Sequence, residues 1–469
     1  MNPSTLLLDV GGQSCRALAV DDVEATIRFE TRERVAVADD GEHSERNADE
    51  LAGALTKVVE TTCRDAAQAD RPVVRAALAV ERGSVVCWNR LDGSALSPVI
   101  SWRDRRQTRG LEALAGQAEE IKRRTGLRFS PYGGAGKLAW CLNHLEPVKN
   151  AFEQGRLAFG PLGSFLLARL LAGRPFRTDP TLAQRTLLWS AEDRDWDAWL
   201  LERFGLPARA LPRVAASRSR HGTMAGHGRS VPLELLMGDQ NCVPFLDGTP
   251  RADTLYINLG TGAFLLRPLD YPVADERFQL SVLKADGCSR WALEASVHGA
   301  ASALAWLERT GARPIDHEQH QGLRERCSHP PLFANTVDGL GSPWWRTGPE
   351  PCFVDDSGDP DGRLLAVLES IAFLIRSNVE AMSERLPPPR RIVLGGGLSR
   401  STTLCELITD LLGMSAERLI STEATALGLW CCLHGRALPR QHFEAIGWQS
   451  HPGLEHRYRR WLGYMTSAS

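Results

Sequence analysis

Two stretches of the chain share the same order of apolar, polar and glycine positions. Residues 5–20 and 254–266 each begin with an apolar run that contains one Asp or Asn, continue through a glycine turn and end with a second apolar run. Apolar runs on both sides of a glycine turn predict a β-hairpin in each stretch. Because the copies lie near the start of each half of the chain, the repeat predicts two similar domains, residues 1–238 and 239–440, followed by a C-terminal extension, residues 441–469.

Strand and helix patterns alternate along the rest of the chain. Residues 73–80 and 84–88 are short apolar runs that predict buried strands, whereas residues 49–64 and 137–145 carry apolar positions at the spacing of a helix. The longest helical pattern, residues 363–382, predicts an amphipathic helix. This alternation is typical of an α/β fold.

A second glycine-rich turn follows a predicted strand in the second half. Residues 391–394 form the strand, three glycines follow at residues 395–397, and a helix is predicted for residues 401–412 with Gly413 at its end. A glycine turn between a strand and a helix lets flat rings approach the backbone, and the amino end of the helix favours polar oxygens. The pattern therefore predicts a nucleotide-binding position.

The charge balance argues against large charged partners. The 469 residues include 55 Lys and Arg and 57 Asp and Glu, which gives a formal net charge of −2. Such a balance produces no strong field for nucleic acid or a membrane surface, and no apolar run reaches the roughly 18 residues of a membrane span. The first ten residues lack the regions of a secretory signal, and the basic stretch 457–461 is interpreted as a solvated helix face. We therefore expect a cytoplasmic protein with a small-molecule partner and no nucleic acid or membrane partner.

Several chemically suggestive residues lack the spacing that their chemistry requires. The 11 cysteines contain no C-x-x-C pair, so neither a zinc site nor a disulfide framework is expected. Residues 133–138 contain Gly-Lys without a following Ser or Thr, which excludes a P-loop. His317 and His320 are three residues apart instead of the four of a zincin helix, so we interpret them, with His221 and His227, as parts of solvated loops.

Two aspartates are candidates for phosphoryl chemistry. Asp239 follows an apolar run and a glycine, where a carboxylate that projects from a strand accepts the proton of a substrate hydroxyl as that oxygen attacks a phosphorus atom. The alternative is that Asp239 caps a following helix, although its position just before the second hairpin favours catalysis. Asp9, inside the first hairpin, either caps the turn or holds Mg²⁺ through water beside a phosphate.

Two aromatic residues lie among polar or glycine-rich neighbours. Trp102 precedes the charged residues 103–106, and Tyr132 precedes Gly133 and Gly134. Polyol and carbohydrate sites set aromatic faces against C–H surfaces and charged groups against hydroxyls. The simpler interpretations are the charged start of a surface helix for Trp102 and an ordinary core position for Tyr132.

Taken in chain order, the motifs resemble those of the FGGY carbohydrate kinase family, most closely its glycerol kinases. Each string is weak by itself, and the order of all of them carries the resemblance. The strings are I-S-W-R-D-R-R (100–106), G-L-R-F-S-P-Y (126–132), K-L-A-W (137–140), T-D-P-T-L-A-Q-R-T-L-L (178–188), G-D-Q-N (238–241), N-L-G-T-G-A-F (258–264), W-A-L-E (291–294), G-L-G-S-P-W-W (339–345), L-E-S-I-A-F (368–373), G-G-G-L-S (395–399) and E-A-T-A-L-G (423–428).

This resemblance implies two ribonuclease-H-like, actin-like ATPase domains with an interdomain cleft. It implies ATP and Mg²⁺ as cofactors and transfer of the γ-phosphoryl group to a hydroxyl of a polyol or sugar, with glycerol the leading candidate. By motif, Asp239 matches the general base and, with Asp9, the carboxylates linked to magnesium. The acceptor is expected at Glu81, Arg82, Trp102, Tyr132, Asp239 and Gln240, and the nucleotide at Gly11, Gly12, Gln13, Ser14, Arg16, Gly260, Thr261, Gly262, Gly396, Gly397 and Ser401.

The chain departs from glycerol kinases at three places. Their G-T-T-S-S-R loop is replaced by G-G-Q-S-C-R at residues 11–16, which removes hydroxyl groups. Their Arg-Glu pair that holds glycerol is reversed to Glu81-Arg82, and because neighbouring side chains of a strand point to opposite faces, the reversal can change which charge faces the acceptor. Ala301 and Ala305 stand where glycerol kinases tend to have Gly and Gln near the nucleotide.

These departures keep two other classes of function open. A binding protein of the same fold with weak catalysis would bind sugar or nucleotide without forming product. An actin-like assembly protein would need self-complementary surfaces that no sequence pattern displays, and the acceptor motifs argue against it. The oligomeric state also stays open, with a homodimer or a higher homo-oligomer among the options.

Overall fold

The computed structural model describes residues 3–286, 288–311, 320–327, 329–356 and 358–467, so His317 of the predicted solvated loop lies outside the described residues. The chain forms two compact units, which we describe separately. Unit 1 comprises Met1–Thr249, Leu280–Trp291 and Thr425–Pro439, and unit 2 comprises Pro250–Gln279, Ala292–Ala424 and Arg440–Ser469.

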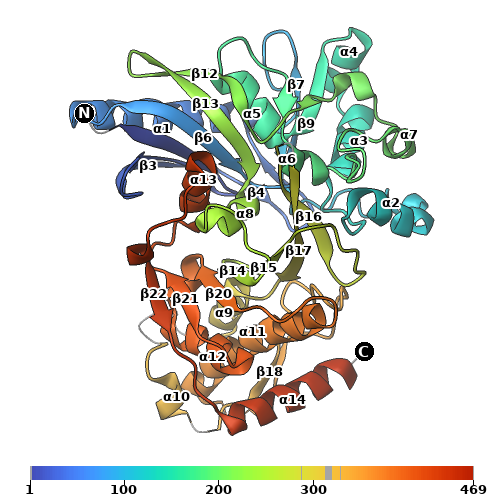
Figure 1. Ribbon diagram of the computed structural model, residues 1–469. Helices are drawn as coiled ribbons and strands as arrows, with labels where there is room; N and C mark the ends of the chain where they lie inside the picture. The colour runs from blue at the N-terminus through green and yellow to red at the C-terminus, as the bar shows by residue number, and fades with distance from the viewer. Residues whose placement is uncertain (1–2, 287, 312–319, 328, 357, 468–469) are drawn as a thin grey trace. The chain divides into compact units, whose positions relative to one another are not determined.

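A six-stranded sheet is the centre of unit 1 (Figure 1). Its first two strands in the sequence form the antiparallel hairpin that the sequence predicts. Two further strands run parallel to the first strand of this hairpin, so three adjacent strands share one direction. The order is β12 (Arg218–Gly226), β13 (Arg229–Gly238), β6 (Val73–Val80), β1 (Ser4–Val10), β2 (Ser14–Asp21) and β3 (Ile27–Arg34), with β13, β6 and β1 parallel.

Helices pack on this sheet because its central strands are apolar. All seven residues of β1 are buried. Helix α1 (Ala48–Gln68) buries Leu51 and Leu55 in the same core as Phe165 of α5 (Leu162–Leu170). Each fully buried side chain of this size contributes about 1.5–3 kcal/mol. At the start of α1, the Asn47 side chain accepts hydrogen bonds from two backbone N–H groups, which fixes where the helix begins.

A second core of unit 1 lies under a smaller sheet. Leu138 and Cys141 of α3 pack with Val148 of α4 and Phe159 of β9. The five-stranded sheet has the order β4 (Ala38–Asp39), β5 (Ser44–Arg46), β8 (Val99–Ile100), β7 (Val85–Asn89) and β9 (Leu157–Pro161). The other elements of unit 1 are η1 (Glu112–Gln117), α2 (Ala118–Thr125), α3 (Gly134–His144), α4 (Glu146–Glu153), β10 (Arg177–Thr178), α6 (Pro180–Gln184), α7 (Ala198–Phe204), η2 (Ala208–Ala210), β11 (Arg213–Val214), α8 (Asp239–Cys242), η3 (Val243–Leu246), β16 (Gln279–Asp286) and α13 (Ala424–His434).

Unit 2 repeats the plan of a hairpin followed by a parallel strand. Its sheet contains, side by side, β17 (Cys288–Val297), β15 (Ala263–Leu269), β14 (Thr254–Leu259), β20 (Arg391–Gly395), β21 (Ala416–Leu419) and β22 (Phe443–Ile446). β14 and β15 form the predicted second hairpin, and β20 runs parallel to β14. The remaining elements are α9 (Ala301–Arg309), α10 (Leu323–Arg326), β18 (Leu332–Ala334), β19 (Cys352–Val354), α11 (Pro360–Ser383), η4 (Gly397–Arg400), α12 (Thr402–Leu412), η5 (Arg440–His442) and α14 (Pro452–Ser467).

The strongest periodic patterns predict the elements well. Residues 73–80 coincide with β6, and residues 363–382 lie inside α11. Helix α12 ends at Gly413, which has a φ of 62° in the left-handed region that glycine adopts without strain. Helix α3 begins at Gly134 instead of residue 137, because glycines at a helix start escape a pattern that counts only apolar positions.

The compact units divide the chain differently from the predicted domains. Unit 1 continues past the expected boundary at residue 238 to Thr249 and includes Thr425–Pro439. Residues 441–469 are part of unit 2 and not a separate extension, because β22 pairs with β21 and α14 packs on β18.

Only part of the basic stretch of residues 457–461 is solvated, which corrects the solvated face expected from its composition. Tyr458 and Trp461 are buried in α14. Arg457 pairs with the buried Glu369 of α11 and donates to two proline carbonyl oxygens, each at 2.8 Å. Burial raises the pKa of Glu369, and the Arg457 guanidinium opposes that effect. Composition alone does not predict these contacts, because it shows the charge of Arg457 but not the Glu369 carboxylate that neutralises it.

His221 is a second correction of this kind. It lies within β12 and is buried, with Nε2 at 3.0 Å from the Ser217 carbonyl oxygen. His227 lies between β12 and β13 and has a positive φ of 45°. The first histidine is thus a core residue, whereas the second is in the turn that the glycines predict.

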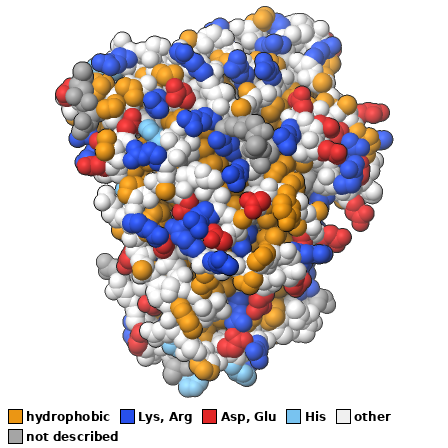
Figure 2. Space-filling view, viewed as in Figure 1, with side chains coloured by type: hydrophobic (Ala, Val, Ile, Leu, Met, Phe, Trp, Pro, Cys, Tyr) orange, Lys and Arg blue, Asp and Glu red, His pale blue; other side chains and the backbone are white. Residues whose placement is uncertain are grey.

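The surface carries charges of both signs. On the face drawn in Figure 2, side chains of both signs are present, and several Lys and Arg side chains gather in groups. Among the helices of the described residues, none has the length and apolar character needed to cross a membrane.

The Arg457 and Glu369 pair provides a test of this packing. In an Arg457→Met variant the buried carboxylate loses its partner, which costs about 3–5 kcal/mol and lowers Tm by about 10 °C. The matched control is Arg459→Met, because Arg459 on the same helix is 76% exposed in its ion pair with Glu455. Scanning calorimetry of both variants checks this, and equal Tm shifts would contradict the packing role.

Candidate active site

The polar side chains of unit 1 gather where three parallel strands end. The last residues of β1, β6 and β13 are in register, so the next row contains Gly11, Glu81 and Asp239. The Glu81 N–H donates to the Val10 carbonyl at 2.9 Å, which extends the pairing of β1 and β6 to this row. The carboxyl ends of parallel strands are where ligands bind in open α/β sheets.

The T-D-P-T string holds the end of β13. Asp179 caps α6, and burial raises its pKa to about 6 although Ser217 and Thr181 donate hydrogen bonds to it. The Thr181 hydroxyl also accepts from the Gly238 N–H at 2.7 Å. This contact fixes the backbone immediately before Asp239.

The turn between β1 and β2 is closed by its own backbone and by one arginine. The Gly11 N–H donates to the Ser14 carbonyl at 3.1 Å, and Arg46 Nη1 donates to the Gly11 carbonyl at 2.8 Å. Gly12 and Gln13 are exposed at the tip of the turn. Because glycine has no Cβ, an anion can approach this backbone closely.

Glu81 has charged and hydroxyl partners inside unit 1, and its expected contact with the acceptor stays a prediction. Its side chain is 3% exposed and forms an ion pair with Arg46, which is 1% exposed. The Ser84 hydroxyl donates to the same carboxylate oxygen at 2.6 Å. Since Arg46 also holds Gly11, this pair connects the end of β6 to the turn between β1 and β2.

Arg82, the neighbour of Glu81, lies beside Asp239 instead. Its Nε is 3.9 Å from Asp239 Oδ1, and its Nη1 donates to Asn241 Oδ1 at 3.2 Å. A Cβ at Gly238 would lie 2.7 Å from the Arg82 side chain, so only glycine fits at position 238 beside Arg82. The reversed Glu81-Arg82 pair therefore presents a cation to Asp239 and turns the carboxylate inward.

Asp239 is the first residue of α8 and does not act as its cap, because Gly238 occupies the cap position. The carboxylate accepts from the Gln240 N–H at 2.8 Å and from Gln240 Nε2 at 3.2 Å, and 22% of the side chain is exposed. Burial raises the pKa of Asp239, while the Arg82 charge and the Gln240 hydrogen bonds act in the opposite direction. A carboxylate with a raised pKa and an open side is suited to accept a proton.

Trp102 and Tyr132 form an exposed aromatic pair in two turns. They are 38% and 39% exposed, and their ring centroids are 6.2 Å apart. Neither a helix start at Trp102 nor a core position for Tyr132 is observed. Gly83 lies against both, because a Cβ there would be 3.1 Å from Trp102 Cβ and from the Tyr132 carbonyl oxygen.

Two residues near this site were not predicted as functional. Arg46 holds the β1 to β2 turn, and Lys137 is buried beside the segments that carry Trp102 and Tyr132. The only sequence signal for Lys137 is a lysine among small and apolar residues at the start of a predicted helix. Arg46 has no such signal, because its partners lie 35 residues away.

In unit 2, the predicted hairpin turn is tightly packed. The Gly260 N–H donates to the Gly262 carbonyl at 2.9 Å, and two N–H groups at the start of α9 donate to the carbonyls of Gly260 and Thr261. A Cβ at Gly262 would lie 2.7 Å from the Val297 carbonyl oxygen. Packing within unit 2 therefore leaves room only for glycine at position 262.

The turn after β20 has one tight and one open glycine. Gly396 has a φ of 90°, and a Cβ there would lie 2.4 Å from the Leu259 carbonyl oxygen. A Cβ at Gly397 would meet no atom within 4 Å. Ser401 is fully buried, caps α12 and bonds to His320 at 2.7 Å, and its expected contact with the nucleoside stays a prediction.

Comparison with known proteins identifies the family. The model of the N-terminal domain of the FGGY family of carbohydrate kinases matches residues 4–244, and the model of its C-terminal domain matches residues 255–432. The chain belongs to the FGGY family of carbohydrate kinases.

Relatives of this FGGY kinase support the assignment. It is 31% identical to glycerol kinase 1 of Pseudomonas aeruginosa over 78% of this chain and 77% of the relative. It is 30% identical to the glycerol kinase of Alcanivorax borkumensis over 91% of this chain and 88% of the relative. The crystal structure of Plasmodium falciparum glycerol kinase with ADP has the same fold, with a TM-score of 0.87 at 20% identity over 100% of this chain and 98% of that one.

As an FGGY kinase, the protein is an ATP-dependent carbohydrate or polyol kinase that uses Mg²⁺, with the two-domain, ribonuclease-H-like fold of the family. Its donor set agrees with a magnesium ion held mainly by phosphate. Among the described residues no cluster of three or more His, Cys, Asp or Glu is suited to hold a metal. Asp9 pairs with Arg16, and the charges of Asp239 and Asp9 both add to burial in raising the pKa of the Cys242 thiol. Asp9 and Asp239 are two carboxylates, and Mg²⁺ beside phosphates takes only one or two.

Gly83 provides a test of the acceptor side of this FGGY kinase. Its φ of 82° and the two contacts at 3.1 Å predict that Gly83→Ala displaces the aromatic pair and raises the acceptor KM about tenfold. The control is Gly413→Ala, where φ is 62° but no atom lies within 4 Å of a new Cβ. Steady-state kinetics compare the two, and an acceptor KM that changes equally in both variants would contradict the assignment.

Proposed function

We propose that this kinase transfers the γ-phosphoryl group of ATP to a hydroxyl of a small polyol, with glycerol as the first candidate. The observation that carries the proposal is Asp239, which combines a raised pKa, an exposed side and the adjacent Arg82 at the end of β13. The named relatives are glycerol kinases at about 30% identity, which supports this acceptor above other polyols and sugars.

In the proposed reaction, Asp239 accepts the proton of the acceptor hydroxyl while the oxygen forms a bond to the γ-phosphorus and the bond to ADP breaks. Arg82 sets the direction of the Asp239 carboxylate and supplies N–H donors to neighbouring hydroxyls. The exposed faces of Trp102 and Tyr132 bind the C–H surface of the acceptor. Most of the rate enhancement then comes from positioning and from charge stabilisation.

We assign the phosphate and metal side of unit 1 to the β1 to β2 turn and to Asp9. Gly12 and Gln13, at the exposed tip of the turn, supply backbone and amide donors to phosphate oxygens, while Gly11 and Ser14 close the turn through their own hydrogen bond. Mg²⁺, when bound, neutralises charge on the phosphates beside Asp9 and Asp239. The glycines of unit 2, from Gly260 to Gly262 and at Gly396 and Gly397, are assigned to the nucleotide.

One observation favours a second candidate function, a binding protein with weak catalysis. Glu81 is paired with Arg46, so the acceptor side has one carboxylate fewer than the resemblance to glycerol kinases implies. Loss of one hydrogen-bonding partner for a polyol hydroxyl lowers affinity and selectivity. The two candidates differ in whether product is formed under saturating MgATP.

The acceptor class follows from ADP release with Mg²⁺ and ATP across glycerol, other polyols, ketopentoses and hexoses. We expect glycerol to stimulate release most strongly. If only a sugar stimulates ADP release, the protein is a kinase whose acceptor is that sugar and not glycerol. If no compound stimulates ADP release although the protein binds ATP, the result would favour the binding protein with weak catalysis.

The role of Asp239 is tested by Asp239→Asn. Removing the proton acceptor is expected to lower kcat about 10²–10⁴-fold while the Kd for ATP changes less than about threefold. Asp253→Asn is the matched control, because Asp253 lies in an exposed ion pair with Arg251. Turnover close to that of the unchanged enzyme in Asp239→Asn would remove Asp239 from this role.

The raised pKa of Asp239 also predicts a pH dependence. Only the ionised carboxylate accepts a proton, so kcat/KM for the acceptor decreases as pH falls through that raised pKa. The measurement is kcat/KM against pH with MgATP saturating, and an acid limb is expected above the ordinary value of 3.8. A flat profile down to pH 4 would contradict it.

A further inference from the structure

Lys137 of α3 is a fully buried lysine in unit 1 whose ammonium donates to three backbone carbonyl oxygens. Its Nζ lies 3.4 Å from the Gly83 oxygen, 3.0 Å from the Trp102 oxygen and 3.2 Å from the Tyr132 oxygen. An ammonium group has three N–H donors, so each carbonyl receives one.

The three carbonyls belong to three separate segments. Gly83 follows Arg82 after β6, Trp102 follows β8, and Tyr132 precedes α3. The Trp102 N–H donates to Ser84 Oγ at 2.9 Å and β7 pairs with β8 at Val85 and Ile100, so the first two segments are also joined to each other. Lys137 adds one cation that all three segments share.

We propose that Lys137 is the positioning residue of the acceptor site, which holds Arg82, Trp102 and Tyr132 in one arrangement through the backbone of their three segments. This inference rests on the proposed function for its kinetic consequence but not for its structural one. Lys137 itself is buried and does not touch the acceptor.

Burying an ammonium is unfavourable, and a side chain of similar length without charge would fill the same space. What such a side chain lacks is three donors directed at three carbonyls. We therefore attribute the presence of a buried cation at this position to the arrangement that it imposes on the three segments, and not to packing.

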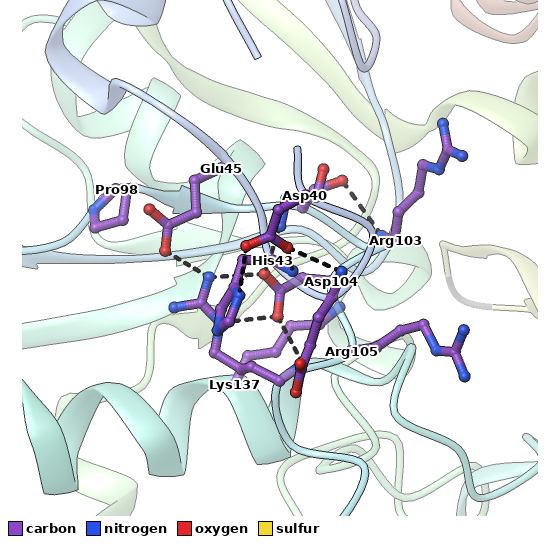
Figure 3. A network of polar contacts seen from close by, with 12 residues as sticks. Asp40, His43, Glu45, Pro98, Arg103, Asp104, Arg105 and Lys137 are labelled. Carbon is purple, nitrogen blue, oxygen red and sulfur yellow. Dashed lines mark hydrogen bonds and ion pairs between the residues drawn. The ribbon is translucent and has the colours of Figure 1, made fainter. Parts of the chain in front are cut away.

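The charged groups around Lys137 set its protonation. Burial lowers its pKa from 10.5 to about 7, the carboxylates of Asp104 and Glu81 raise it, and the Arg106 guanidinium lowers it further. Asp104 accepts from the Ser44 N–H at 2.8 Å and pairs with Arg106. Figure 3 shows Asp104 and Lys137 in the same polar network. Glu81 is paired with Arg46, so both carboxylates are already partly neutralised.

Deprotonation changes the match between donors and carbonyls. A neutral amine keeps two N–H donors and directs a lone pair at the third carbonyl, which loosens one segment. The acceptor KM is therefore expected to increase as pH rises through about 7. The stability effect has the opposite sign, because the unfolded lysine keeps its proton up to about 10.5, so the unfolded state binds more protons and folding is favoured as pH rises above 7.

The kinetic test compares Lys137→Met with Lys149→Met, the same substitution on the next helix, α4. We expect Lys137→Met to raise the acceptor KM about tenfold, with kcat and the KM for ATP within about threefold of the unchanged enzyme. The alkaline increase in acceptor KM should disappear in Lys137→Met and persist in Lys149→Met. A purely structural lysine would instead lower Tm without this split and without the pH effect.

A second readout does not depend on finding the acceptor. Amide hydrogen exchange, corrected for intrinsic rates, should be faster near residues 83–84, 101–103 and 131–133 in Lys137→Met, and in the unchanged protein at pH 8 compared with pH 6. If exchange changes but no acceptor is phosphorylated, the proposed function fails and the positioning role stands. If Lys137→Met does not fold, the pH series on the unchanged protein still decides. Unchanged exchange in these segments, or an acceptor KM that is independent of pH between 6 and 8, would overturn the proposal.

Discussion

The candidate active site depends on the register of three parallel strands. β1, β6 and β13 end in the same row, because Val10 and Gly238 both lie opposite Val80. A shift of one residue in any of these strands would turn its polar residue to the other face of the sheet. β1 is buried along its whole length, and β6 and β13 are buried where they approach this row, so the position of Asp239 is a consequence of apolar packing.

Buried charged residues then fix the positions of the segments that follow these strands. The pair of Arg46 and Glu81 connects the β1 to β2 turn with the end of β6, and Ser84 extends the connection to the Trp102 N–H at 2.9 Å. Lys137 connects the three segments of the acceptor side. Removing one partner of a buried ion pair costs several kcal/mol, so such networks enforce one arrangement more strongly than exposed pairs do.

The reversed Glu81-Arg82 order shows which features of the site local sequence predicts and which depend on tertiary contacts. Alternation along a strand indicates that the two side chains point to opposite faces. It does not indicate which of them pairs with Arg46, because Arg46 comes from a different strand. In the same way, Ser401 has a residue type suited to nucleoside contact, but its hydroxyl is engaged by the start of α12 and by His320.

The sequence by itself determined the two hairpins, the α/β alternation, the long helix α11 and the family of the protein, because these follow from periodicity and from the order of short motifs. It also singled out Asp239, Arg82, Trp102 and Tyr132 as candidates. The tertiary structure alone decided the inward turn of Glu81, the burial of Tyr458 and Trp461, and the contacts of Lys137. The physical reason is that a buried polar or charged group is defined by its partners, and these partners come from segments distant in the chain that no local pattern connects.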